Sequence, residues 1–203
     1  MPEASRLILA SGSAARRALL EAAGLVFDVV PANIDEAAVR NAILDATTGA
    51  EGVDIASVLA AEKARLVSEM HPSALIIGAD QVLALGGRIF GKAENMAEAR
   101  EILTMLRGRT HELISAVALA RDGKVHWQAH DFAEMTVRNF SDEFLGCYLG
   151  KMGERVLESV GCYEIEGPGV QIFEHIDGDY FTILGIPLIQ LLGRLRHEGM
   201  VTA

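Results

Sequence analysis

Residues 74–83 read Ala74-Leu75-Ile76-Ile77-Gly78-Ala79-Asp80-Gln81-Val82-Leu83. This short apolar run is rich in branched residues and is flanked by Pro72 and Gly78, a pattern that predicts a buried strand. An ionised carboxylate without a partner is costly in an apolar interior. We therefore expect Asp80 to be paired, protonated or bound to a metal, or to face a cleft at the end of the strand.

The residues that follow predict a β-hairpin. The strand continues to Leu85, and the chain turns at Gly86-Gly87. A second strand then pairs with the first and ends shortly before Lys92. Two interpretations of the two charges stay open. Either Asp80 and Lys92 work together, or Asp80 is a structural carboxylate and Lys92 is a solvated surface charge.

Composition limits the class of protein. Of 203 residues, 50% are hydrophobic and 23% charged, which is ordinary for a soluble globular protein and excludes disorder. The net charge of −10 argues against a nucleic-acid polymer as partner, although not against a single nucleotide. No apolar run is long enough to span a bilayer. Met1–Ala10 shows no secretory signal, and Cys147 and Cys162 are expected to be free thiols, so we expect a cytoplasmic protein.

A strand at 6–10, a loop at 11–13 and a helix ending before Gly24 open the chain. The start of a helix offers backbone N–H groups to a phosphate, and Ser11, Ser13 and Arg16 add hydroxyls and a guanidinium there. Plain capping by Ser13 with a solvated Arg16 is the alternative. The loop lacks the spacing and the lysine of a P-loop.

The other elements follow from hydrophobic period and turn residues. We expect helices at 37–44, 55–70, 95–106, 142–149 and 188–196, and strands at 25–30, 110–120 and 125–137. Glu36, beside Asp35, could bind a hard cation or open a helix. Lys63 is expected to be a solvated helix lysine unless a cleft adjoins it. The glycine-rich residues 161–170 form either a loop and edge strand or a surface that a flat ligand can approach.

Several of these segments resemble, in content and in order, the Maf family of nucleoside triphosphate pyrophosphatases over nearly the whole chain. The segments are Leu9-Ala10-Ser11-Gly12-Ser13-Ala14-Ala15-Arg16-Arg17, Ile34-Asp35-Glu36, Lys63, Gly78-Ala79-Asp80-Gln81-Val82, Gly91-Lys92, Tyr163-Glu164-Ile165-Glu166-Gly167 and Gly185-Ile186-Pro187-Leu188. A Walker-type glycine-rich loop ending in Lys-Ser or Lys-Thr is absent from the sequence, which argues against a phosphotransferase.

The resemblance implies a fold and a reaction. The fold is mixed α/β, with a bent sheet, flanking helices and two lobes around a cleft, similar to inosine triphosphatase, in one domain over 1–203. The reaction cleaves a nucleoside triphosphate between its α and β phosphates, giving the monophosphate and pyrophosphate, with Mg²⁺ or Mn²⁺. A homodimer is implied, and a role in clearing the nucleotide pool or in arresting cell division.

The same resemblance implies the residues of the reaction. Asp80 activates the water or holds the metal, Glu36 shares the metal, and Lys63 and Lys92 neutralise developing charge. Phosphoryl chemistry needs little more than positioning, a metal and cations. One or two carboxylates with waters and substrate oxygens suit Mg²⁺.

Substrate contacts are implied as well. Ser11, Ser13 and Arg16 would hold the phosphates, while Gln81 and Glu166 would face the base or the ribose. Glu166 resembles the branch that takes 7-methyl-GTP, because a carboxylate can accept from the N1–H and amine of guanine.

The chain departs from the family in places. Ala15 replaces the usual arginine and the bulky aromatic of the 7-methyl-GTP branch, and Ser115-Ala116 replaces a usual Thr-Gly. The base therefore stays open between 7-methyl-GTP and a dTTP or UTP type. The alternative function is a non-catalytic, nucleotide-binding regulator of cell division.

Overall fold

The structure is a computed structural model that describes residues 6–46 and 49–202. Predictions that touch residues 1–5, 47–48 and 203 lie in part outside the described residues, among them the absence of a signal in Met1–Ala10 and the outer limits of the domain at 1–203. Within the described part of the chain, no helix combines the length and the apolar character that crossing a bilayer requires.

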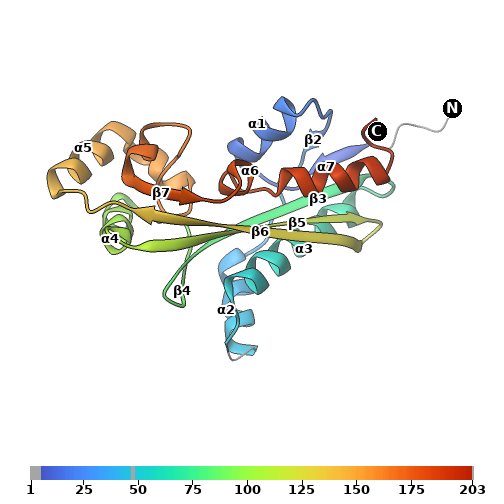
Figure 1. The fold of residues 1–203 in the computed structure, drawn as a ribbon. Helices are drawn as coiled ribbons and strands as arrows, with labels where there is room; N and C mark the ends of the chain where they lie inside the picture. Colours follow the sequence, from blue (N-terminus) through green and yellow to red (C-terminus); the bar gives the residue numbers. More distant parts are fainter. Residues whose placement is uncertain (1–5, 47–48, 203) are drawn as a thin grey trace. The chain divides into compact units, whose positions relative to one another are not determined.

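Two compact units make up the chain, each assembled from separate stretches. Unit 1 comprises Met1–Gln81, Ile114–Asp131 and Asp179–Ala203, and unit 2 comprises Val82–Leu113 and Phe132–Gly178. Three strands have residues in both units: β3 (Leu75–Leu85), β5 (Thr110–Arg121) and β6 (Lys124–Val137) (Figure 1). The single domain expected over 1–203 stays a prediction.

The strands form a mixed sheet. Their order is β2-β1-β3-β5-β6-β7, and β4 pairs with β3. β1 (Leu7–Leu9) is parallel to both β2 (Asp28–Val29) and β3, whereas β4 (Arg88–Phe90) and β7 (Phe173–Asp177) are antiparallel to their neighbours. The predicted α/β class, with a mixed sheet and flanking helices, is confirmed.

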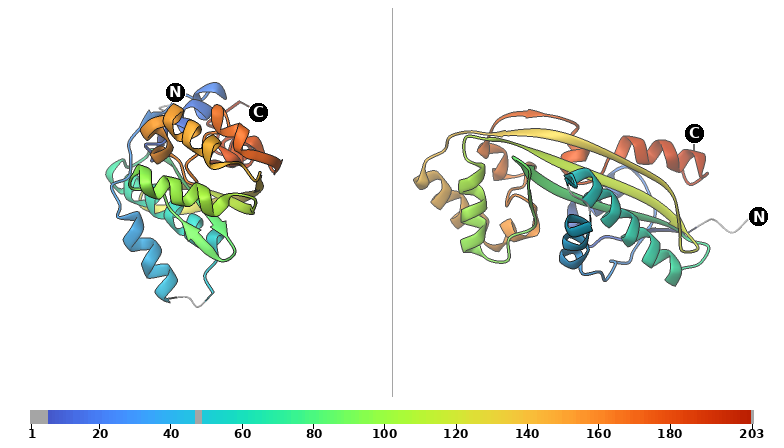
Figure 2. Two further views of the ribbon diagram at one scale, coloured as in Figure 1. Left: turned by 90° about the vertical axis from the view of Figure 1, so that its left-hand side faces the viewer. Right: turned by 90° about the horizontal axis from the view of Figure 1, so that it is seen from below.

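Unit 1 contains the parallel part of the sheet and helices on both of its faces. These helices are α1 (Ala14–Ala22), α2 (Glu36–Ala46), α3 (Gly52–Met70), α6 (Tyr180–Ile183) and α7 (Leu188–His197). α1 and α7 cover one face, and α3 covers the other (Figures 1 and 2). The core under α1 and α7 joins Leu20, Ile77, Leu119 and Leu191.

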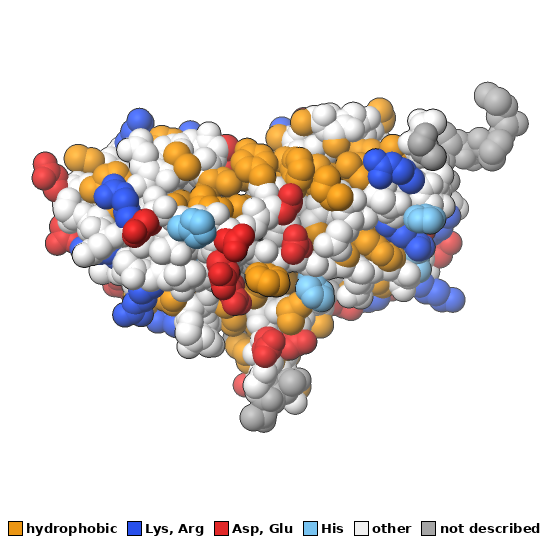
Figure 3. Space-filling model, in the orientation of Figure 1, with side chains coloured by type: hydrophobic (Ala, Val, Ile, Leu, Met, Phe, Trp, Pro, Cys, Tyr) orange, Lys and Arg blue, Asp and Glu red, His pale blue; other side chains and the backbone are white. Residues whose placement is uncertain are grey.

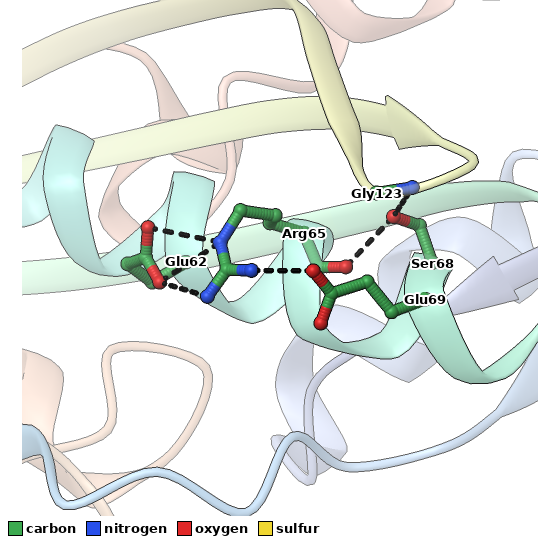
Figure 4. A network of polar contacts seen from close by, with 5 residues as sticks. All are labelled: Glu62, Arg65, Ser68, Glu69 and Gly123. Atoms are coloured by element: carbon green, nitrogen blue, oxygen red, sulfur yellow. Dashed lines mark hydrogen bonds and ion pairs between the residues drawn. The ribbon is translucent and has the colours of Figure 1, made fainter.

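Polar contacts also tie α3 to the turn between β5 and β6 in unit 1 (Figure 4). The buried hydroxyl of Ser68 donates to the carbonyl of Arg65 at 2.7 Å and accepts from the backbone N–H of Gly123 at 2.9 Å. Arg65 forms ion pairs with Glu62 and Glu69 at 2.8 and 2.6 Å. The hydroxyl thus fixes the turn to the helix.

Unit 2 contains α4 (Met96–Leu106), α5 (Asp142–Met152) and the 3₁₀ helices η1 (Gly153–Glu158) and η2 (Pro168–Ile172). α4 packs against α5 and η1. Ser141 caps α5 by accepting from the N–H of Phe144 at 3.1 Å. Neither 3₁₀ helix was expected, since both lie in glycine-rich or short segments without a helical period.

The strand expected at 25–30 was largely wrong. Only Asp28–Val29 is paired, at the edge of the sheet. The N–H of Leu25 bonds to the carbonyl of Leu20, and Gly24 has a φ of 78°, so the first of these residues complete the end of α1. Val26 is 93% exposed. An apolar run that follows a helix C-cap resembles a strand in sequence, although most of it is not paired.

Candidate active site

Alternation along β3 decides where Asp80 lies. Successive side chains of a strand point to opposite faces. Leu75, Ile77 and Ala79 join the core with α1 and α7, so Gly78 and Asp80 face α3. A Cβ at Gly78 would lie 2.1 Å from the carbonyl oxygen of Ala60, which shows that the strand and the helix are in direct backbone contact. Asp80 is therefore held against α3.

Lys63 on α3 meets that carboxylate. Its Nζ lies 2.6 Å from Oδ1 of Asp80 and 2.7 Å from Oε1 of Glu36, the first residue of α2. The side chains of Lys63 and Asp80 are each only 7% exposed, whereas that of Glu36 is 48% exposed. The expectation of a solvated Lys63 was wrong, and the expectation that Asp80 has a partner is confirmed.

Burial shifts the protonation of this group. It raises the pKa of the Asp80 carboxyl above its ordinary value, against the opposing positive charges of Lys63 and Arg16. Burial likewise lowers the pKa of the Arg16 guanidinium, while Asp80 and Glu36 oppose that shift. A carboxyl whose pKa is raised toward neutrality is a better proton acceptor for general-base chemistry.

The loop between β1 and α1 forms a second part of the site. Ser11 is buried, and its Oγ accepts from the N–H of Ser13 at 3.3 Å and from Nη1 of Arg16 at 3.0 Å. Oγ of Ser13 caps α1 by accepting from the N–H of Arg16 at 3.4 Å. Capping by Ser13 is confirmed, but Arg16 is buried, not solvated.

Gln81 lies in a third group of polar contacts. Its Nε2 donates to Oγ of Ser115 and to the carbonyls of Thr182 and Ile183 at 3.0 to 3.1 Å. Ser115 also donates to the carbonyl of Thr182 at 2.7 Å. These contacts orient the side-chain amide of Gln81.

Seven of the nine residues named from the sequence lie in unit 1: Ser11, Ser13, Arg16, Glu36, Lys63, Asp80 and Gln81. Lys92 and Glu166 belong to unit 2, and both are exposed. Sequence reasoning gave no role to Gly185, Ser115 or Thr182, whose backbone and hydroxyl groups hold Arg16 and Gln81. The only signal for Gly185 was its place in the segment Gly185-Ile186-Pro187.

The donor set suits a small hard cation. Glu36 and Asp80 supply carboxylate oxygens, and among the described residues Asp80 contacts Lys63 through Oδ1. Within that part of the chain, no cluster of three or more His, Cys, Asp or Glu side chains could enclose a metal. A cation here would thus take its other ligands from water and a bound phosphate, as Mg²⁺ commonly does.

Comparisons with known proteins match this chain along nearly its whole length. The family model described as "Maf-like protein" matches residues 6–198. A 7-methyl-GTP pyrophosphatase of Brucella abortus biovar 1 (strain 9-941) is 50% identical over 196 residues, covering 97% of this chain and 98% of that protein. A nucleoside triphosphate pyrophosphatase of Caulobacter vibrioides (strain ATCC 19089 / CIP 103742 / CB 15) is 49% identical over 197 residues, covering 96% of each chain.

Among solved structures, a nucleoside-triphosphatase / dITP/XTP pyrophosphatase from Mycobacterium abscessus ATCC 19977 / DSM 44196 matches with a TM-score of 0.42. Its sequence is 14% identical, and the match covers 96% of this chain and 95% of that chain.

Proposed function

The chain belongs to the Maf-like protein family. We propose that it is a nucleoside triphosphate pyrophosphatase whose reaction centre is the group formed by Lys63, Asp80 and Glu36 in unit 1. The observation that carries this is the buried ammonium of Lys63 in contact with Asp80 and Glu36. Relatives at about half identity are named for this activity. The reaction uses water to release pyrophosphate and leaves a nucleoside monophosphate.

The β1–α1 loop is suited to hold the phosphates. Ser11 already accepts two hydrogen bonds and Ser13 accepts one, so each keeps its O–H proton as a donor. The N-terminus of α1 adds backbone N–H groups and the positive end of the helix dipole. Phosphate oxygens, which only accept, match these donors.

Asp80 acts as the general base in this proposal. Its raised pKa, caused by burial, favours uptake of the proton that the attacking water loses. Lys63 holds the carboxylate by its 2.6 Å contact and places a positive charge where charge develops on the phosphates. Lys92, exposed in unit 2, is proposed as a further cation for the same purpose.

Glu36 and Asp80 would hold a divalent cation, which when bound supplies Lewis-acid stabilisation of the phosphate oxygens. The proposal predicts that a chelator abolishes pyrophosphate release and that Mg²⁺ or Mn²⁺ restores it. Glu36→Gln should raise the metal concentration needed for half-maximal rate by about tenfold or more. Asp35→Asn is the matched control, since Asp35 accepts from the N–H of Ala38 at 2.9 Å and asparagine can keep that bond.

A metal-independent rate in the wild type would contradict the metal proposal. So would a Glu36→Gln variant whose metal requirement is unchanged.

7-methyl-GTP is the proposed substrate. The Brucella relative is named for it, and Glu166 is an exposed carboxylate that can accept from the N1–H and amine of guanine and balance the positive charge of the methylated base. The test is pyrophosphate release from 7-methyl-GTP, GTP, dTTP, UTP and CTP. We expect 7-methyl-GTP to give the highest kcat/KM.

Glu166→Gln should lower kcat/KM for 7-methyl-GTP by about tenfold or more without a matching loss for dTTP, because a charge-assisted hydrogen bond is lost. Glu174→Gln, also exposed in unit 2, is the control. A preference for dTTP or UTP would overturn the choice of base but not the enzyme. Nucleotide binding without any release would support the regulator of cell division.

A further inference from the structure

Arg16 is a buried cation that donates hydrogen bonds to backbone and hydroxyl oxygens. It is only 9% exposed. Nε donates to the carbonyl of Gly185 at 2.7 Å, and Nη1 donates to Oγ of Ser11 and to the carbonyl of Ala79, each at 3.0 Å.

These acceptors come from three separate segments of unit 1. Ser11 lies in the β1–α1 loop, Ala79 in β3, and Gly185 between α6 and α7. A guanidinium is planar and its donors have a fixed geometry, so three such bonds fix the segments relative to one another. Lysine could not form all three hydrogen bonds, because its ammonium has a single nitrogen in place of the separate Nε and Nη1 donors.

Gly185 is fitted to the guanidinium. A Cβ at this position would lie 3.1 Å from Nε and 3.3 Å from Nη2 of Arg16. Its φ of 101° is also one that side-chain-bearing residues rarely adopt. The missing side chain of Gly185 therefore leaves the space that the guanidinium of Arg16 occupies, which is evidence separate from the hydrogen bonds.

Ala79 directly precedes Asp80. The carbonyl that Arg16 holds belongs to the peptide group between the two residues, so its orientation sets the direction of the next Cα–Cβ bond. We propose that Arg16 is a positioning residue that fixes this peptide and thereby holds the Asp80 carboxylate at Lys63, and that binding the substrate phosphates is not its main role.

This inference rests on the proposed function. The alternative is that Arg16 binds phosphate through Nη2, whose N–H groups take no part in the three bonds above. The two roles predict different kinetics. A positioning residue acts on turnover, and a misplacement of about 1 Å at a catalytic group can cost about 10²-fold. A phosphate ligand acts on the affinity for the triphosphate and for pyrophosphate.

The test compares Arg16→Met, Arg16→Lys and Gly185→Ala with the wild type. Gly185→Ala keeps the charge of Arg16 but displaces the guanidinium. Three quantities are measured: kcat with the triphosphate, the Kd of inorganic pyrophosphate with Mg²⁺ by calorimetry, and the thermal unfolding temperature. Arg17→Ala is the matched control, because Arg17 is adjacent on α1, exposed, and paired with Glu21 at 3.6 Å.

We expect Arg16→Met and Gly185→Ala to lower kcat by about 10²-fold while the Kd of pyrophosphate changes less than about twofold. Arg16→Lys should recover little of the rate. A Kd weakened tenfold or more in Arg16→Met, with wild-type Kd in Gly185→Ala, would overturn the inference, as would an unchanged kcat. If Arg16→Met does not fold, Arg16→Lys and Gly185→Ala decide. An inactive wild type would instead refute the proposed function.

Discussion

Lys63 supplies one ammonium to two carboxylates from different elements, Asp80 on β3 and Glu36 at the start of α2. Removing charges from water is costly, and the contact between them offsets the cost only when the geometry is close. The distances of 2.6 and 2.7 Å meet that condition. Once formed, the group keeps a carboxylate close to the β1–α1 loop, which we propose to bind the phosphates.

At the scale of residues, the sequence predicted that Asp80 must be paired, but it did not identify Lys63 as the partner. A carboxylate in the apolar run at 74–83 had to be paired, and it is. Lys63 was expected to be solvated because a lysine on a helix is exposed by default. It lies instead on the buried face of α3, where Ile55, Leu59 and Val67 and also Ala56, Ala60 and Ala64 are fully buried, whereas Val58 is 39% exposed. Small residues allow the close contact with β3 but carry little hydrophobic signal.

His111 in unit 2 gives a pH prediction. It is 1% exposed, its Nε2 lies 2.6 Å from the hydroxyl of Tyr163, and burial lowers its pKa from 6.5 to about 4. Below about pH 6.5, His111 therefore binds a proton in the unfolded chain but stays neutral in the folded chain until about pH 4, so stability falls as the pH falls. We expect this residue to remove about 2 kcal/mol of unfolding free energy between pH 7 and pH 5.

Urea denaturation at the two pH values checks this. His111→Gln should reduce the pH dependence by that amount, whereas His130→Gln, at an exposed position of β6, should leave it as in the wild type. An identical pH dependence in His111→Gln and the wild type would show that His111 is not the group responsible.

At the scale of elements, the contact between β3 and α3 sets the geometry of the proposed reaction centre. A Cβ at Gly78 would lie 2.1 Å from the carbonyl of Ala60 and 2.6 Å from the N–H nitrogen of Ala64, both backbone atoms. Gly78→Ala must therefore push the helix off the strand. We expect a loss of about 3 kcal/mol in unfolding free energy and a lower kcat, because Lys63 and Asp80 separate.

Gly193→Ala on α7 is the matched control. No atom lies within 4 Å of the added Cβ there, so the change should stabilise the protein by roughly 0.5–1 kcal/mol, as alanine favours helix. Chemical denaturation measures both variants. A Gly78→Ala protein as stable as the wild type would contradict the packing described for β3 and α3.

Long, strongly patterned elements could be predicted from the sequence, and short ones could not. The predicted bounds of the strand at Leu75–Leu85 and of the helix at Gly52–Met70 differ from the observed bounds by a few residues at most. The helix α6 at Tyr180–Ile183 was not predicted, since four residues are too few to show a helical period. Asp179 caps this helix by accepting from the N–H groups of Phe181 and Thr182. That short helix presents the carbonyls of Thr182 and Ile183 to Gln81.

At the scale of the whole molecule, charge is the clearest property. The net charge is −10, and the face in Figure 3 shows no continuous band of Lys and Arg side chains. A nucleotide must then be attracted by local cations and helix ends, since the net field repels it. The boundaries of the two units could not be predicted from the sequence pattern, because β3, β5 and β6 each run from one unit into the other. The expected homodimer stays a prediction.

The most direct test of the account is the steady-state rate of pyrophosphate release from 7-methyl-GTP with Mg²⁺, for the wild type and Asp80→Asn side by side. Asparagine keeps the shape of the side chain but is a poor base, so we expect release by the wild type and a fall in kcat of at least about 10²-fold in the variant. Near-wild-type kcat in a folded Asp80→Asn protein would contradict the assignment of the reaction to the Lys63–Asp80 group.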